Sequence, residues 1–416
     1  MDTTRSDRLT APTDLAALID AFRHTRNDSL ALCAPLAEGE LTCVAPGGTA
    51  PLWHLGHTTW FLETFLLRPF AEQAVVVGHP LYEAVFAQPP QAPLVRPTVE
   101  DVNAYRRRID QAVSELAASG ELERQPHIAG LLELAVEHEH RHQEALLEDI
   151  LALYGASPFH PAYREASAPG ERTEARPLGW LEHPGGEVWT GAGAEGFALA
   201  DERPRHRRWL PPFALADRLI TNGEYLAFVE DGGYRRPELW LAAGWRARCA
   251  GDWHAPPQWL RAGDAWWTMT LHGLLPLDPA APVAHLSYYE ADAYARWAGA
   301  RLPDEAEWEA LAATHPVTGR LRADGLFLPR PAGEGEPQFY GDLWEWTRSP
   351  YAPYPGHRPP CPPLGEYDGR FPPGHLVLRG GACVTPAARL RPTLREHAAA
   401  DCRRRFTGLR LARDLD

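Results

Sequence analysis

Residues 137–144 read EHEHRHQE, so three histidines and three glutamates fall within eight positions. On an α-helix each residue is rotated by about 100° from the last, so His138 and His142 share one face while His140 points to the other side. Imidazole nitrogens on adjacent turns can bind one metal ion, and helical bundles build such sites from facing helices. This segment therefore predicts a metal site if a second helix supplies another ligand.

Two other interpretations of the segment have to be weighed. A solvated helix face is disfavoured because the apolar stretches LLELAV and ALLEDILALY flank the histidines, which indicates a helix buried on one side. A zinc hydrolase is conceivable because His138 to His142 fit H-E-x-x-H, with Glu139 as general base. The longer form of that signature is missing, since Ala145 stands where it has glycine.

The third interpretation is a three-histidine centre with open coordination positions. The apolar, Trp-rich segment WHLGHTTWF contains His54 and His57, and either could be the additional ligand. Three protein ligands leave room for substrate and for oxygen or water, which is the catalytic arrangement. Imidazole ligands suit iron, zinc, copper and nickel, so the ligand type does not select the metal.

Helical periodicity predicts the elements that position these histidines. Apolar spacing indicates four helices, which suit an antiparallel bundle within residues 1–160, over residues 14–35, 51–68, 99–118 and 126–154. Residues 161–178 are polar and rich in Pro, Ala and charge, as in a linker. Residues 179–416 are dense in Gly, Pro and Trp, with short β-like runs and two predicted helices, 221–230 and 287–298, the second with a capping box.

Composition limits the class of protein. A chain of 416 residues exceeds what one core usually holds, so two domains are expected. The net charge of −14 and the lack of a basic run argue against nucleic acid as the main partner. No apolar run approaches the roughly 20 residues that span a bilayer. With six scattered cysteines, no C-x-x-C pair and no signal-like N-terminus, the expected location is the cytoplasm.

Nearly the whole chain resembles a known enzyme family. The segments WHLGHTTWFLETFLL and HEHRHQE are followed by TNGEYLAFVEDGGYRRPELWL, ADAYARWAGARLPDEAEWEAL, GDLWEWTRSPYAPYPGHRP, LRGGACVTP and GLRLAR. In this order they resemble the sulfoxide synthases of ergothioneine biosynthesis. The resemblance implies a DinB-like four-helix bundle followed by an irregular α+β domain of the formylglycine-generating-enzyme-like, C-type-lectin-like kind, with Trp344 and Trp346 buried and Arg379 bridging loops.

The resemblance also implies a reaction. The family uses non-haem Fe(II) and O2 to join a thiol sulfur to the imidazole C2 carbon of hercynine (trimethylhistidine), and it oxidises that sulfur to a sulfoxide. Its iron ligands match His57, His138 and His142 of this chain. His54 is then a packing neighbour or a hydrogen-bonding partner of a ligand. Glu144 becomes a candidate acceptor for the free N–H of a ligand histidine.

The chain departs from its relatives where substrates are expected. Relatives usually read H-E-Q-Q-H-Q-E, whereas this chain has His140 and Arg141 between the ligands. Arg141 is therefore a candidate for binding a substrate carboxylate. One tyrosine of a Tyr-Tyr pair found in relatives is missing, which leaves Tyr82 as the candidate proton donor, with Tyr351 and Tyr354 as alternatives.

The C-terminal segment LREHAAADCRRRFTGLRLAR also differs from the aromatic-rich stretch of relatives. Arginine forks bind carboxylates with two hydrogen bonds, so Arg395, Arg403 and Arg404 are candidate substrate ligands. Cys383 and Cys402 show no copper-binding cysteine pattern, so formylglycine-generating activity is not expected. The aromatic residues of this domain could hold a trimethylammonium group by cation–π attraction.

The substrates follow only in outline. The donor could be cysteine, γ-glutamylcysteine or a selenium compound, as in selenoneine synthases, and the acceptor could be histidine, as in the ovothiol branch. A non-catalytic metal- or thiol-binding module is the alternative from another class.

Overall fold

The computed structural model describes residues 14–70, 80–87, 97–165, 175–335, 337–359 and 370–415. The chain divides into two compact units. Unit 1 comprises Met1–Ala156, Gly193–Ala200 and Arg358–Arg370, and unit 2 comprises Ser157–Ala192, Asp201–His357 and Phe371–Asp416. Among the described residues, none of the helices has both the length and the apolar character needed to cross a membrane.

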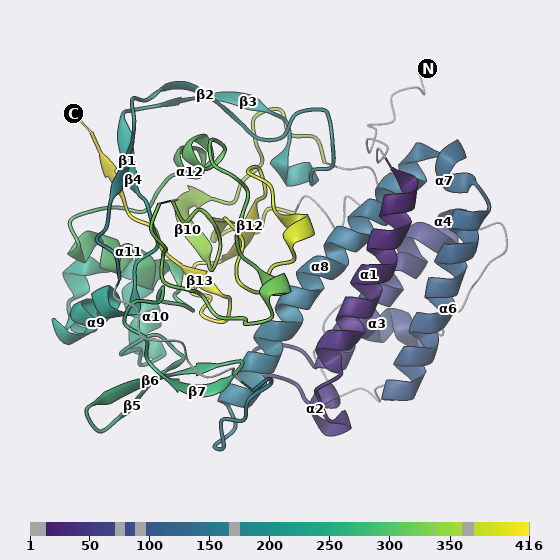
Figure 1. The fold of residues 1–416 in the computed structure, drawn as a ribbon, viewed down its shortest axis with the longest axis horizontal. Coiled ribbons are helices and arrows are strands. Elements are labelled where there is room, and N and C mark those ends of the chain that lie inside the picture. Colours follow the sequence, from purple (N-terminus) through teal and green to yellow (C-terminus); the bar gives the residue numbers. More distant parts are fainter. Residues whose placement is uncertain are drawn as a thin grey trace. The chain divides into compact units, whose positions relative to one another are not determined.

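Unit 1 is a helical bundle whose long helices lie alongside one another (Figure 1). The four predicted helices are confirmed as α1 (Leu15–Cys33), α3 (Pro51–Leu62), α6 (Val99–Ala118) and α8 (Pro126–Gly155). Shorter helices connect them: α2 (Glu38–Thr42), α4 (Arg68–Phe70), α5 (Pro80–Phe86) and α7 (Glu121–Arg124). The sequence places proline at the first position of α3 and α8, where its missing N–H has no cost.

Helix α3 is buried over its whole length, and it passes directly into a π-helical turn at Glu63–Leu67. Periodicity predicted one continuous helix over 51–68, and the wider turn was not foreseen. Such π turns are rare and often occur next to functional sites. Here the π-helical turn begins at Glu63, six residues after His57 on the same continuous helical segment.

Unit 2 is built from short strands and short helices. Its described sheets have the orders β1–β4–β14, β12–β11–β10–β13, β2–β3, β5–β6–β7 and β8–β9. The strands are β1 (Trp180–His183), β2 (Gly186–Thr190), β3 (His206–Leu210), β4 (Phe213–Ala216), β5 (Trp259–Ala262), β6 (Ala265–Thr270), β7 (Gly273–Pro276), β8 (Gly319–Arg320), β9 (Tyr340–Gly341), β10 (Trp344–Pro350), β11 (His375–Arg379), β12 (Glu396–Ala399), β13 (Thr407–Gly408) and β14 (Ala412–Asp414).

The helices of unit 2 include both that the sequence predicted. These are α9 (Asn222–Glu230), capped by Thr221, and α11 (Tyr288–Trp297), where Ser287 and Glu290 form the expected capping box. Helices α10 (Ala242–Ala250) and α12 (Glu305–Ala312) were not predicted. Helix α9 is equally short, but Thr221 marked its start, whereas α10 has no side-chain N-cap. The capping box of α12, formed by Asp304 and Glu307, was a signal that the sequence interpretation missed.

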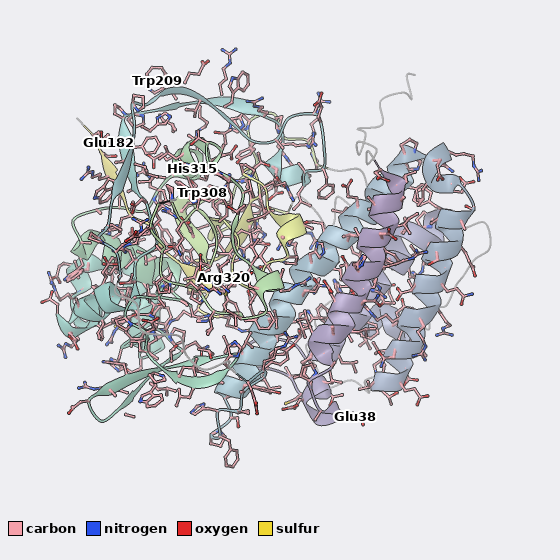
Figure 2. All side chains as sticks on the ribbon, in the orientation of Figure 1. Glu38, Glu182, Trp209, Trp308, His315 and Arg320 are labelled. Atoms are coloured by element: carbon pink, nitrogen blue, oxygen red, sulfur yellow. The ribbon has the colours of Figure 1, made fainter. Side chains whose placement is uncertain are left out.

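Tryptophans form the centre of unit 2. Trp308, Trp344 and Trp346 are fully buried, and Figure 2 shows Trp308 inside the unit while Trp209 points outward at its surface. Arg379 lies over the Trp308 ring and donates to Glu309 and to the carbonyls of Pro392 and Thr393. The expected buried tryptophans and the loop-bridging role of Arg379 are therefore confirmed.

The expected fold class, a helical bundle followed by an irregular α+β domain, is confirmed. The expected linker, residues 161–178, is described only in part. Within the described part, Tyr163 is buried in unit 2, and its N–H donates to the Leu271 carbonyl. The domain boundary itself stays a prediction.

Candidate metal centre

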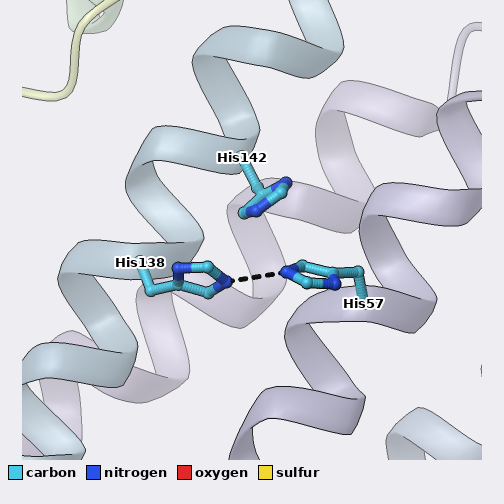
Figure 3. A group of neighbouring side chains, drawn as sticks. All are labelled: His57, His138 and His142. Atoms are coloured by element: carbon cyan, nitrogen blue, oxygen red, sulfur yellow. Dashed lines mark hydrogen bonds between the residues drawn. The ribbon is translucent and has the colours of Figure 1, made fainter. Parts of the chain in front are cut away.

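His57 of α3 and His138 and His142 of α8 converge on one point in unit 1 (Figure 3). One ligand atom of each ring lies within 4.8 Å of the others, and the Nε2 atoms of His57 and His138 are 3.0 Å apart. Two nitrogens bound to one metal at about 2.1 Å and at right angles would lie about 3 Å apart. The spacing of this pair therefore suits a shared metal ion.

The proton of His57 is placed by the end of helix α5. The Nδ1–H of His57 donates to the Phe86 carbonyl at 2.5 Å, and the indole N–H of Trp53 donates to the Val85 carbonyl at 2.9 Å. The last carbonyls of a helix have no partner within it, so α5 offers two acceptors. With its proton on Nδ1, a neutral His57 has its Nε2 lone pair directed at His138.

Aromatic rings hold two of the imidazoles flat. His57 stacks on Trp53 with ring centroids 4.5 Å apart, and His138 stacks on Phe61 at 4.2 Å. Both aromatic residues belong to α3 and are buried. The stacking restricts rotation of the ligand rings and lines this side of the cluster with apolar surface.

Burial keeps His57 and His142 neutral. Desolvation, only partly offset by the hydrogen bond to Phe86, lowers the pKa of His57 to about 4. The pKa of His142 is also lowered, mainly by burial and to a smaller extent by the nearby His57 and His138. Neutral imidazole is the form that binds a metal, so these histidines are ready to act as ligands at neutral pH.

The remaining nitrogen of His142 points at His54. The Nδ1 atoms of the two rings are 2.9 Å apart, and the Nε2 of His54 lies 2.9 Å from the Asp149 carboxylate. The sequence left His54 as a packing neighbour or a hydrogen-bonding partner, and the structure gives it the second role. Asp149 was missed, although it lies seven residues after His142 and hence on the same helix face.

The absence of a side chain at Gly56 allows the Phe86 ring to pack closely against α3. A Cβ added at Gly56 would lie 2.0 Å from the Phe86 ring, so the ring would have to move. We expect Gly56→Ala to cost about 1–3 kcal/mol of stability by overpacking. We also expect metal affinity to fall by about tenfold or more, because the Phe86 carbonyl orients His57.

Thermal unfolding and a metal titration measure both effects of Gly56→Ala. Gly39→Ala is the matched control, since nothing lies within 4 Å of a Cβ added there. Unchanged metal affinity in a folded Gly56→Ala protein would show that the position of Phe86 does not matter to His57.

Glu139 is not available as a general base. Its carboxylate accepts hydrogen bonds from Ser29 at 2.6 Å, Arg26 at 3.0 Å and Arg106 at 2.5 Å, all within the bundle interior. Burial raises its pKa, but the two arginines outweigh burial and hold the pKa at about 2. A carboxylate already paired with two cations is a poor proton acceptor, so the zinc-hydrolase interpretation loses its catalytic base.

Two arginines predicted to bind substrate, Arg395 and Arg403, form ion pairs with buried acids of unit 2. Arg395 donates to both carboxylate oxygens of Glu305 and to the carbonyls of Asp201 and Ala352. Arg403 donates twice to Glu290. Their guanidinium groups are engaged within the protein, so these contacts give no support to the substrate-binding predictions.

The other predicted residues lie as follows. Tyr82 belongs to α5 and packs against Tyr105 with ring centroids 4.6 Å apart. Burial and the nearby Asp101 raise its pKa, so it keeps its proton at neutral pH. Arg141 on α8 is half-buried, Glu144 is buried on the same helix, and Arg404 is half-buried in unit 2. The functional roles of these residues stay predictions.

The alternative tyrosines, Tyr351 and Tyr354, and the two cysteines considered above, Cys383 and Cys402, belong to unit 2. Tyr351 donates to Asp201 at 2.8 Å, and Tyr354 donates to Glu305 at 3.2 Å. Cys383 is fully buried and Cys402 is half-buried, and neither forms a disulfide with another described cysteine.

Comparison with known proteins identifies both parts of the chain. Residues 21–146 match the DinB superfamily, and residues 166–324 and 329–415 match the sulfatase-modifying factor enzyme 1-like domain. The chain is 34% identical to hercynine oxygenase of Mycolicibacterium thermoresistibile, covering 88% of this chain and 87% of that protein. Hercynine oxygenase of Mycobacterium tuberculosis is 32% identical, with coverage of 91% and 94%.

A further relative covers a smaller share of the chain. The formylglycine-generating enzyme of Streptomyces coelicolor is 30% identical over 62% of this chain and 96% of its own length. The hercynine oxygenases, by contrast, span both parts of the chain, including the histidine cluster.

Proposed function

This chain belongs to the hercynine oxygenase family, and we propose that it uses Fe(II) and O2 to join a small thiol to the imidazole C2 carbon of hercynine. The product is a sulfoxide of ergothioneine biosynthesis. The observation that carries the proposal is the convergence of His57, His138 and His142, which offers three nitrogen donors at spacing suited to one ion. Three protein ligands leave positions open for substrates.

The overall reaction balances without another reductant. The new C–S bond replaces the S–H bond of the thiol and the C–H bond at imidazole C2. One atom of O2 remains on sulfur, and the other leaves as water with the two hydrogens. Bound iron would supply the one-electron chemistry that O2 requires and would hold the sulfur as thiolate.

The protein's own groups position and protect this chemistry. The hydrogen bond to Phe86 sets the tautomer of His57. The rings of Trp53 and Phe61 cover one side of the cluster and exclude water from it. The partial exposure of His142 suits an open side from which substrates approach.

Substrate recognition is proposed around the same helices. Arg141 directly precedes His142 and is half-buried, so its guanidinium suits a substrate carboxylate. Tyr82 keeps its proton and sits on α5, the helix whose carbonyl orients His57, which suits a proton donor. Glu144 remains the candidate acceptor for the free N–H of a ligand histidine.

A product assay tests the proposal and identifies the donor. The protein is loaded anaerobically with Fe(II), then mixed with hercynine, ¹⁸O2 and cysteine, γ-glutamylcysteine or a selenium donor in separate reactions. We expect one reaction to give a coupled product that carries one ¹⁸O and depends on both iron and oxygen. Mass spectrometry reads out the product.

The other outcomes are equally informative. Oxidation of the thiol without coupling would indicate that hercynine is not the acceptor, and histidine would then be tested in its place. Absence of oxygen consumption in every reaction would overturn the enzymatic proposal and favour a metal- or thiol-binding module.

A further inference from the structure

A histidine and an aspartate lie behind one of the three metal ligands. His54 sits one turn before His57 on α3, and its ring lies between His142 and Asp149 of α8. Its Nδ1 is 2.9 Å from Nδ1 of His142, and its Nε2 is 2.9 Å from Oδ2 of Asp149. His54 and Asp149 are buried, with 5% and 3% exposed.

The direction of these hydrogen bonds follows from the groups present. A carboxylate only accepts, and the Asp149 oxygen also receives the backbone N–H and the hydroxyl of Thr49, at 3.0 and 2.7 Å. His54 must therefore carry its proton on Nε2. When each ring holds one proton, Nδ1 of His54 is an acceptor, and the proton between the two rings belongs to His142.

This assignment has a consequence at the metal site. With its proton on Nδ1, His142 has a lone pair on Nε2. The opposite tautomer would turn an N–H toward the metal position and would leave two lone pairs facing each other across 2.9 Å. The chain of hydrogen bonds from Asp149 through His54 to His142, called the relay below, thus selects the tautomer of His142 that can bind a metal.

We propose that Asp149, acting through His54, is a positioning residue that keeps the proton of His142 on Nδ1 and presents its Nε2 to the metal. This inference rests on the proposed function only in requiring that the three histidines bind a metal. The relay also joins α3 to α8, the two helices that supply the ligands. His57 achieves the same tautomer with the backbone carbonyl of Phe86, which substitution cannot remove, so His142 is the ligand whose support can be tested.

Metal affinity and the Co(II) spectrum test the relay without turnover. Fe(II) and Co(II) affinities are measured anaerobically by competition with a chelator. His54→Leu removes the acceptor and should weaken binding by about 10–100-fold, as loss of an outer hydrogen-bonding partner does. His54→Asn should recover part of this, because its side-chain oxygen can take the place of the ring Nδ1.

Asp149→Asn should also weaken binding, because an amide can donate to His54 and so favour the wrong tautomer. Since Asp149 acts through His54, adding Asp149→Asn to His54→Leu should cause no further loss. Glu148→Gln, on the same helix beside Asp149, is the matched control and should bind metal as wild type does. Circular dichroism confirms that each variant is folded before its affinity is measured.

Two results would overturn the relay. Folded His54→Leu and Asp149→Asn proteins could both bind Co(II) with wild-type affinity and spectrum. Alternatively, the losses from the His54 and Asp149 substitutions could add, which would show that Asp149 does not act through His54.

If the wild type forms product while the variants bind metal normally, the relay fails and the proposed function stands. If the variants lose Co(II) while the wild type forms no product, the relay stands and the proposed function fails.

Discussion

His57→Ala should abolish metal binding and product formation. His57 is the ligand that comes from α3, and without it only the two histidines of α8 remain in the described cluster. The loss of affinity should exceed the roughly 100-fold that removal of an outer hydrogen-bonding partner causes. An anaerobic Fe(II) titration and the product assay measure the two effects.

His140→Ala is the matched control for His57→Ala. His140 lies on α8 between the ligands, but its ring faces α1, with Nε2 2.9 Å from the Thr25 hydroxyl. It should retain one bound Fe(II) and should turn over. A His57→Ala protein that still binds iron and forms product would remove His57 from the ligand set.

Glu139→Gln should destabilise unit 1 by about 3–5 kcal/mol, the usual effect of removing one partner of a buried ion pair. The substitution leaves Arg26 and Arg106 buried, 3% and 1% exposed, without their shared carboxylate. Urea unfolding of the full chain, followed by helical circular dichroism, measures the change. Glu115→Gln, an exposed acid on α6, should change stability by less than about 0.5 kcal/mol.

The same carboxylate gives a pH dependence with a defined sign. The folded-state pKa of Glu139 is about 2, below the roughly 4.3 of an unfolded glutamate. Its contribution of about 3 kcal/mol is therefore complete at neutral pH and is lost as the pH falls from about 4 toward 2. In the Glu139→Gln protein this part of the acid sensitivity should be absent.

Turnover separates this structural role from catalysis. Per folded molecule, Glu139→Gln should form product at close to the wild-type rate, because the carboxylate does not face the metal site. A folded variant that binds metal normally but has lost all activity would contradict the assignment of Glu139 to the ion-pair network.

Periodicity was sufficient to find the four long helices of unit 1 and the helix face that His138 and His142 share. The four-residue spacing of His138 and His142 fixes their common face whatever surrounds them. The family resemblance then selected His57 over His54. What periodicity could not supply is which turn of α3 faces which turn of α8, so the contacts of His54 with His142 and Asp149 appeared only in the folded chain.

The partners of the predicted substrate arginines could not be found from the sequence, for a physical reason. A run of arginines near an expected pocket has the same appearance whether it serves a ligand or a buried acid. In unit 2 the acids come from capping boxes and helix starts far away in sequence. Glu290 is the last residue of the α11 capping box and pairs with Arg403, and Glu305 begins α12 and pairs with Arg395.

The central claim, that His57, His138 and His142 bind iron together, is tested most directly by X-ray absorption at the iron edge. The protein is loaded anaerobically with one equivalent of Fe(II). We predict scattering from three imidazole rings with nitrogen at about 2.1 Å, and one ring fewer in any His142→Ala protein that still holds iron. A spectrum dominated by carboxylate oxygens, or one unchanged in both His57→Ala and His142→Ala, would place the iron elsewhere and contradict the account.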